Sequence, residues 1–253
     1  MKKILLGMGM LTLTFFSNAQ ESTDSVDMII DNYIENIGGV EAWEAVEGVK
    51  MSAEVDAQGM TIPIDIYQMM DGRAITKFTY QGMEIVQGAF DGEIMWSTNF
   101  MSMAAEKAES EETENKKRTV VAGMNPYINY GDKGYTVEYM GEEAVDGVDC
   151  YKIKMTKGQL LVDGEEIDDI SYTYFDIETF VPIKEETEVH SGQMKGETAI
   201  TIYSDYEEVD GLYFAFSITQ KSKDSDGQTI EFDEIELNPE LDDDFFKFPG
   251  EEK

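Results

Sequence analysis

Residues 51–67 read MSAEVDAQGMTIPIDIY, and they carry the clearest secondary-structure pattern in the chain. Apolar and polar residues alternate on both sides of Gln58-Gly59, which is the pattern of two half-buried β-strands. A glycine in a two-residue connection favours a tight turn between antiparallel strands. The stretch therefore predicts a β-hairpin.

The same period of two recurs through most of the chain, so many further strands are expected. Asp-Gly pairs, which favour tight turns, punctuate them at 71–72, 91–92, 146–147, 163–164, 210–211 and 226–227. The predicted strands are 73–80, 83–90, 93–98, 135–140, 150–156, 171–177, 181–189, 197–203, 212–220 and 229–237. An open sheet of about a dozen strands is expected to curl. We therefore predict a mainly β protein with helices (α+β): a single curved antiparallel sheet that forms an unclosed β-barrel with a helical lid.

Three local features refine this prediction. Apolar residues between Val26 and Ile37 recur at helical spacing, and Gly38-Gly39 supplies a stop, so the sheet is preceded by a helix. The charged segment Met101–Lys117 predicts a second helix, which would lie over a sheet face or the barrel mouth as the lid. In the last strand the apolar alternation shifts near Asp233-Glu234, which predicts a β-bulge.

Composition excludes several classes of protein. The 253 residues carry a formal charge of −34, which disfavours binding to nucleic acids and to anionic lipid headgroups. One Cys excludes an intramolecular disulfide, and one His leaves little for His-based catalysis or metal binding. A hydrophobic content of 42% nevertheless allows a substantial core.

The N-terminus has the pattern of a secretory signal peptide. Lys2 and Lys3 precede the apolar run 4–16, and Ser17-Asn18-Ala19 provides small residues before a cut after Ala19. We therefore expect a signal peptide over 1–19, a single domain over 20–253, and export to the periplasm. The lone Cys150 is expected to be buried in that oxidising compartment.

No catalytic or metal-binding pattern stands out. His190 lies in a predicted hairpin tip, and no serine elbow accompanies it, so we predict no enzyme, no cofactor and no metal. Residues 222–233 partly match a calcium loop through Asp224 and Asp226, but strands flank them and a β-turn at Asp226-Gly227 explains them better. Calcium binding there is left open.

Apolar clusters are the more informative candidates for a binding site. Methionine side chains adapt to ligands of variable shape such as acyl chains, although ordinary core packing is the alternative for each residue. The candidate lipid-binding residues are Phe78, Tyr80, Met95, Trp96, Phe100, Met101, Met103, Phe214 and Phe216. Arg73 opens a strand rich in aromatic residues and is a candidate to hold a polar headgroup, with a surface ion pair as the alternative.

A series of short motifs gives the chain a resemblance to a known family. In order they are Arg73 at a strand start, Asp91-Gly92 before Trp96, Asn125-Pro126-Tyr127, Gly147 before 150–153, the segment 174–183, and 245–249. Their order resembles the outer-membrane lipoprotein carrier family, the LolA/LolB-like periplasmic proteins. The resemblance covers nearly all of the chain after the signal peptide.

The resemblance implies an unclosed β-barrel whose helices cover an apolar cavity, and a non-enzymatic carrier that delivers acylated lipoproteins or lipids toward the outer membrane. It implies that Arg73 tethers the lid. We expect acylated cargo, a basic membrane-protein donor or acceptor, no nucleic acid, and a monomer. The alternative is a periplasmic sensor or interaction module of the same fold, with a self-filled cavity, which binds a basic protein partner.

Overall fold

The computed structural model describes residues 18–57, 60–223, 225–242 and 244–250. Within them lie the helices α1 (Asn18–Asn36), α2 (Val40–Glu44) and α3 (Ser110–Thr119), and the 3-10 helix η1 (Val120–Ala122). The strands are β1 (Gly48–Ala57), β2 (Met60–Met69), β3 (Ala74–Tyr80), β4 (Met83–Phe90), β5 (Met95–Asn99), β6 (Ala104–Lys107), β7 (Thr136–Val145), β8 (Val148–Val162), β9 (Glu165–Asp176), β10 (Pro182–Glu188), β11 (Thr198–Val209), β12 (Leu212–Ser222) and β13 (Gln228–Leu237). No helix among these residues is long and apolar enough to cross a bilayer.

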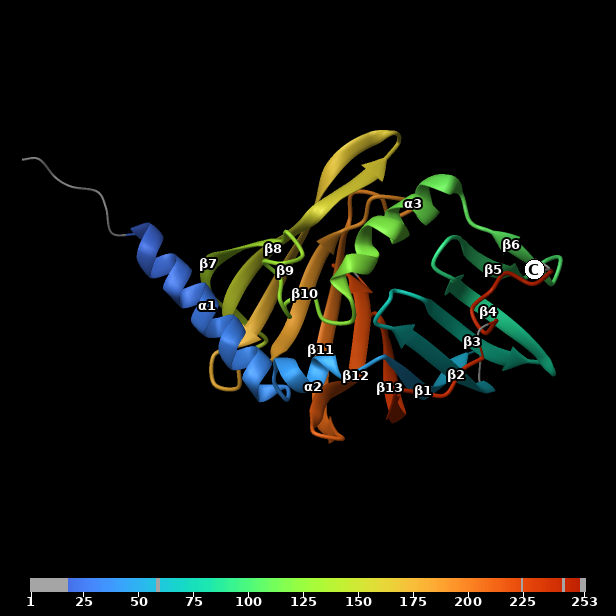
Figure 1. The fold of residues 1–253 in the computed structure, drawn as a ribbon, viewed down its shortest axis with the longest axis horizontal. Helices are drawn as coiled ribbons and strands as arrows, with labels where there is room; N and C mark the ends of the chain where they lie inside the picture. The colour runs from blue at the N-terminus through green and yellow to red at the C-terminus, as the bar shows by residue number, and fades with distance from the viewer. Residues whose placement is uncertain (1–17, 58–59, 224, 243, 251–253) are drawn as a thin grey trace, which may run out of the picture.

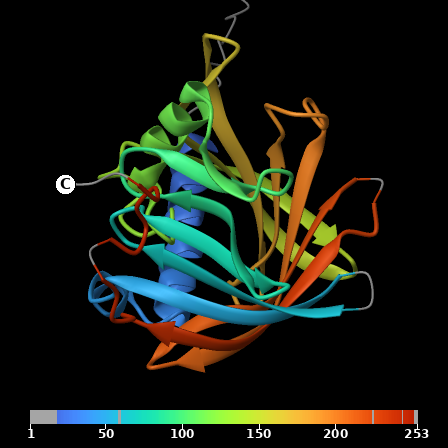
Figure 2. The ribbon, with the colours of Figure 1, turned by 90° about the vertical axis from the view of Figure 1, so that its right-hand side faces the viewer.

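The described strands form one antiparallel sheet in the order β6-β5-β4-β3-β2-β1-β13-β12-β11-β10-β9-β8-β7. Neighbours along the chain pair as hairpins, and the pairing of β1 with β13 joins the two halves. The sheet curves strongly, as Figures 1 and 2 show, but its end strands β6 and β7 do not pair with each other. The predicted unclosed β-barrel is therefore confirmed.

The connection between the two edge strands carries helix α3. Residues 108–135 run from β6 to β7, and α3 crosses between the two halves of the sheet (Figure 1). Helix α1 lies over the half formed by β7 to β10 (Figure 1). We call the face that α1 and α3 cover the inner face of the sheet, and the opposite one the outer face.

Local chemistry explains the hairpins and the curvature. In the turn Asp146-Gly147 the φ angles are 50° and 90°, as a type I′ turn requires. The bulge predicted near Asp233 is confirmed, because Ser52 pairs with Glu234 while Ala53 pairs with Phe232. Asp233 is left as the extra residue, which bends the strand at the junction of the two halves.

Two predicted segments differ from the structure. Strands β8 and β9 continue through residues 157–170, which were predicted as a connection, because the shift at Gly158 (φ 114°) obscures the alternation. The predicted lid helix 101–117 begins only at Ser110. Residues 104–107 instead pair with β5, after a turn in which the Asn99 side chain accepts hydrogen bonds from the backbone of Met101 and Ser102.

The main core lies on the inner face. Helix α1 directs its apolar stripe, including Ile29 and Tyr33, into a cluster with residues of both sheet halves. Phe175 of β9 is fully buried at its centre and makes edge contacts with the rings of Tyr33 and Tyr127. This cluster fixes α1 and the segment around residue 127 against the sheet.

A second core lies on the outer face. Tyr67, Ile75, Ala89 and Trp96 are cross-strand partners in a row across β2 to β5, and Phe246 from the C-terminal segment buries them. The indole of Trp96 donates a hydrogen bond to the Phe246 carbonyl at 2.9 Å. The C-terminal residues 241–248 therefore cover the outside of this half of the sheet.

Cys150 is fully buried, as predicted. Burial raises the pKa of its thiol, which keeps the sulfur in the unreactive protonated form. We expect no reaction with a thiol reagent such as DTNB at pH 8 in the native protein, and complete reaction in 6 M guanidinium chloride. Rapid modification of the native protein would contradict this placement.

Candidate functional site

A cavity of about 210 Å³ lies between the inner face and the helices that cover it, and we call it the first cavity. Its wall comes from α1 and α2, from β1 and β2, from β9 to β13, and from the segment after η1. The lining residues are Tyr33, Trp43, Val49, Met51, Gln68, Met124, Asn125, Pro126, Tyr127, Thr173, Pro182, Glu185, Tyr203, Tyr206, Tyr213, Phe214, Ala215, Ile218 and Ile235. The cavity is therefore mainly aromatic and aliphatic.

A few polar groups point into this apolar space. The buried Asn125 amide donates a hydrogen bond to the Tyr33 hydroxyl at 2.8 Å, and its oxygen accepts one from the Tyr127 backbone N–H. The Tyr127 hydroxyl is buried near Thr173 but makes no hydrogen bond of standard geometry within the described residues.

On the sheet side of the cavity the polar groups centre on Glu185 of β10, the cross-strand partner of Thr173. The Tyr203 hydroxyl donates to the Glu185 carboxylate at 3.0 Å, and the Tyr206 hydroxyl donates to the Pro182 carbonyl at 2.7 Å. Burial raises the pKa of Tyr203, and the charge of Glu185 raises it further. Burial likewise raises the pKa of Tyr206 and of Tyr33, so these phenols stay protonated near neutral pH.

A second cavity of about 170 Å³ lies nearer the β5 edge. Gln68 borders both cavities, and Phe90 and Met95 line the second one. Lys116 of α3 also borders it, with its ammonium group 5.8 Å from the centre of the Phe90 ring. The two cavities thus lie on either side of Gln68 on the inner face.

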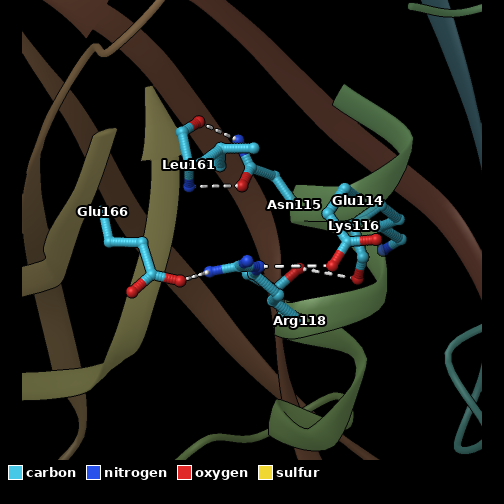
Figure 3. A network of polar contacts seen from close by, with 7 residues as sticks. Glu114, Asn115, Lys116, Arg118, Leu161 and Glu166 are labelled. Atoms are coloured by element: carbon cyan, nitrogen blue, oxygen red, sulfur yellow. Dashed lines mark hydrogen bonds and ion pairs between the residues drawn. The ribbon is translucent and has the colours of Figure 1, made fainter. Parts of the chain in front are cut away.

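Helix α3 is attached to the far end of the β8–β9 hairpin by polar contacts (Figure 3). The Asn115 side chain donates to the Leu161 carbonyl and accepts from the Leu161 backbone N–H, both at 2.7 Å. Arg118 forms an ion pair with Glu166 at 3.0 Å. The Glu111 carboxylate accepts hydrogen bonds from the backbone of residues 163 and 164.

The other side of α3 faces the opposite half of the sheet. There Lys117 pairs with Glu93 at 3.2 Å, and the Thr113 hydroxyl accepts a hydrogen bond from the Met95 backbone. No residue of α3 is buried. A helix without a buried apolar face gains little from apolar burial, so polar contacts contribute most of its attachment to the sheet. We call α3 the lid.

Most of the predicted lipid-binding residues lie on the inner face. Phe78 pairs with Ile64 of the main core, and its ring stacks on that of Phe100 at 6.2 Å. Phe214 contacts Trp43 and lines the first cavity. Phe216 packs against the same core, Met95 lines the second cavity, and Tyr80 lies two residues beyond Phe78 on β3.

Three predicted residues lie elsewhere. Trp96 faces outward beneath the C-terminal segment, because cross-strand pairing puts it in the row of Ala89 and not in the row of Phe90. Met101 is 97% exposed and Met103 is 38% exposed, because the turn between β5 and β6 carries them away from the sheet. None of these three side chains lines either cavity.

Arg73 does not hold the lid in this structure. Its guanidinium pairs with Asp71 at 2.8 Å and lies 5.2 Å from the Phe246 ring centre, on the outer side. The turn before β3 gives it an acidic partner two residues away, so the alternative of a surface ion pair describes it better. The contact predicted for Arg73 is made instead by Arg118, the other arginine, and by Asn115.

Sequence reasoning missed the polar residues of the first cavity. Strand β10 reads PIKEETE, in which neither face is apolar, so nothing shows that Glu185 points inward. In the sequence, Asn125 and Tyr127 stand out only as part of the motif Asn125-Pro126-Tyr127. The high number of tyrosines is the feature of the sequence that could have indicated the site, because a buried Tyr hydroxyl usually needs a hydrogen-bond partner.

Within the described part of the chain, no group of three or more His, Cys, Asp or Glu side chains is arranged to hold a metal ion. Of the two residues considered for calcium, Asp224 lies outside the described residues. Asp226 lies in the connection between β12 and β13, where Ser225 and Ser222 form a turn.

Comparison with known proteins shows which solved structures have a similar architecture. A family model described as "Uncharacterized protein" matches residues 128–248. No curated protein matches the chain. An outer membrane lipoprotein-sorting domain from Vibrio parahaemolyticus superposes with a TM-score of 0.53 and 11% identity, over 90% of this chain and 97% of that one.

Two further solved structures agree. A LolA superfamily protein from Nitrosomonas europaea has a TM-score of 0.51 and 14% identity, over 89% of this chain and 98% of that one. A DUF1329 family protein from Desulfovibrio piger has a TM-score of 0.50 and 13% identity, over 88% and 97%. The resemblance drawn from the sequence is thus confirmed at the level of architecture: this chain has the unclosed-barrel fold of LolA-superfamily and lipoprotein-sorting proteins.

Proposed function

We propose that this protein is a non-enzymatic periplasmic carrier, which binds the acyl chains of lipoproteins or lipids on its inner face and delivers them toward the outer membrane. The observation that carries the proposal is the pair of apolar cavities on either side of Gln68, the first covered by α1 and α2 and the second bordered by Lys116 of the lid, which has no buried residue. The likeness in fold to lipoprotein-sorting proteins supports it.

Acyl chains need such shielding to cross an aqueous space. Each CH₂ removed from water contributes about 0.8 kcal/mol, so a free chain remains in its membrane. Residues of the inner face supply the replacement surface: Phe78, Tyr80, Met95, Phe100, Phe214 and Phe216. The strongly negative surface keeps the carrier away from anionic membranes between contacts with its partners.

A carrier must also release its cargo, and the lid offers a way. The first cavity holds about 210 Å³, below the range of about 300–1,000 Å³ for sites of drug-sized ligands. A complete acyl chain therefore requires the lid to move away from the sheet. The Asn115 and Arg118 contacts to the β8–β9 hairpin are the polar interactions that this movement breaks.

The proposal is tested by extracting the purified protein with organic solvent and identifying lipids by mass spectrometry. Uptake of a neutral fluorescent monoacylglycerol by the delipidated protein is measured in parallel. We expect co-purifying lipid and saturable uptake at a 1:1 ratio. Protein that carries no lipid and takes up no probe would refute the carrier function and favour the alternative, an interaction module that binds a basic protein.

A substitution at the boundary of the two cavities gives a more local test. Gln68 is exposed and lines both cavities, so Gln68→Trp leaves the core intact while the larger indole takes up space at their border. We expect uptake of the neutral probe to weaken by about tenfold or more, which corresponds to about 1.4 kcal/mol. Gln220→Trp is the matched control, since Gln220 is exposed on β12 and borders neither cavity. Equal effects of the two variants would argue against this ligand path.

A further inference from the structure

We infer that the first cavity binds an ammonium group through Glu185 and the surrounding aromatic rings, so that the cargo is an acylated molecule or lipid that bears a positively charged amine. The inference rests on the proposed function and specifies the class of ligand. The inference concerns the polar end of the ligand, because an acyl chain by itself can bind to any apolar surface.

The charge balance of the cavity is the first observation. Glu185 is the charged member of the lining, and the Tyr203 hydroxyl is its hydrogen-bond donor. In the part of the chain that the structure describes, no Lys or Arg forms an ion pair with Glu185. Its neighbour Glu186 lies on the other face of β10 and pairs there with Lys184. The cavity thus holds one carboxylate to which the described residues supply no paired cation.

The aromatic wall is the second observation. Five tyrosines, with Trp43 and Phe214, surround the same space as Glu185. The negative faces of aromatic rings attract cations, and rings together with a carboxylate form the usual recognition site for quaternary ammonium groups. The Tyr203 hydroxyl donates to Glu185 at 3.0 Å, and the rings of Tyr33, Tyr127 and Tyr203 line the same cavity as this carboxylate.

The available hydrogen-bond acceptors fit the same ligand. The Glu185 carboxylate has acceptor sites beyond the one that Tyr203 uses. These sites can accept from the N–H groups of a primary ammonium. An anionic headgroup is disfavoured, because Glu185 repels it and no Lys or Arg lines the cavity among the described residues. The site therefore favours amines over carboxylates and phosphates.

The position of the site also suits an amphiphile. Gln68 lies at the border between the first cavity, which contains Glu185, and the second cavity, which Phe90 and Met95 line. A ligand with its ammonium group at Glu185 can extend its chain past Gln68 and beneath the lid. This arrangement puts the polar end under α1 and α2 and the apolar end where lid opening exposes it.

The test compares matched probes by isothermal titration calorimetry on the delipidated full chain. Dodecyltrimethylammonium and dodecyl maltoside, both below their micelle concentrations, share a chain and differ in charge. Choline and 3,3-dimethylbutan-1-ol share a shape but only choline is charged, and they separate a free amine from a lipid. Sodium chloride at about 0.15 M shortens the Debye length to about 8 Å and suppresses general attraction to the acidic surface.

We expect dodecyltrimethylammonium to bind about tenfold more tightly than dodecyl maltoside, and Glu185→Gln to remove that difference. Glu188→Gln removes an equal charge from an exposed position near the end of the same strand and should leave it in place. Equal affinities for the two amphiphiles would overturn the inference and leave the carrier function standing. Equal losses in the two variants would assign the effect to surface charge and overturn it too.

The outcome with the short probes separates the two proposals. If choline binds more tightly than its neutral isostere while neither dodecyl chain adds affinity, the ammonium site stands and the acyl carrier fails. If the dodecyl chain adds affinity in both charged and neutral probes, the carrier stands. The ammonium site is then judged by the difference between the two dodecyl compounds.

Discussion

Hydrogen exchange in the lid is expected to accelerate by about thirtyfold when Asn115 is replaced by alanine. The Asn115 side chain makes two hydrogen bonds of 2.7 Å to the Leu161 backbone. At about 1 kcal/mol for each bond, their loss favours the detached lid by about 2 kcal/mol. The amides of residues 110–119, followed by mass spectrometry, report this change directly. Release of the neutral fluorescent probe should accelerate in parallel, because the lid covers the second cavity.

Three control variants make this result specific to the Leu161 contact. Glu112→Ala changes an exposed residue of the same helix and should leave exchange nearly unaltered. Arg118→Ala removes a partly exposed ion pair and should have a smaller effect, because such pairs contribute less than about 1 kcal/mol. Arg73→Leu should leave lid exchange unchanged, since Arg73 contacts Asp71 and Phe246. Acceleration by Arg73→Leu equal to that of Asn115→Ala would return the tethering role to Arg73.

Phe175→Ala is expected to lower the free energy of unfolding by about 3–5 kcal/mol, the usual cost of truncating a buried Phe. Its ring is fully buried and contacts both Tyr33 of α1 and Tyr127 of the cavity wall. The loss therefore loosens the helix and the cavity together. Urea unfolding followed by circular dichroism gives the midpoint and the slope, and the slope should stay constant.

Phe100→Ala is the matched control for this experiment. Phe100 is 59% exposed, and its ring stacks on that of Phe78. An exposed substitution of this kind should change the free energy of unfolding by no more than about 0.5 kcal/mol. Similar losses for the two variants would show that the cluster around Phe175 is not the core that stabilises the fold.

The structure shows where individual acidic residues lie, which the net charge of the sequence does not. The sequence charge of −34 argues against nucleic acids and anionic membranes as ligands. Two neighbouring acidic residues of β10 lie in different surroundings. Glu186 pairs with Lys184 on the outer face, whereas Glu185 lines the aromatic cavity on the inner face. A net charge says nothing about which single carboxylate lies inside.

Much of the fold could be predicted from local patterns. The alternation in residues 51–67 and the Asp-Gly pairs predicted the hairpins, because both are consequences of the two-residue period and of φ angles that few residues adopt. The shift of parity at Asp233 predicted the bulge for the same reason. The candidate site was predicted less well, and Trp96 shows why: its strand was right, but its face depends on which partner strand sets the register.

By itself, then, the sequence determined the order of most strands and the curved sheet, since these follow from interactions between near neighbours. It also predicted the buried Cys150, because a lone thiol in an oxidising compartment is expected to be buried. Only the tertiary structure decided that β1 pairs with β13, that the C-terminal segment covers Trp96, and that Arg118 and Asn115 hold the lid. Only the tertiary structure placed Glu185 in a cavity that five tyrosines line. These contacts join residues distant in the chain, and where both faces of a strand are polar, no local period records which one points inward.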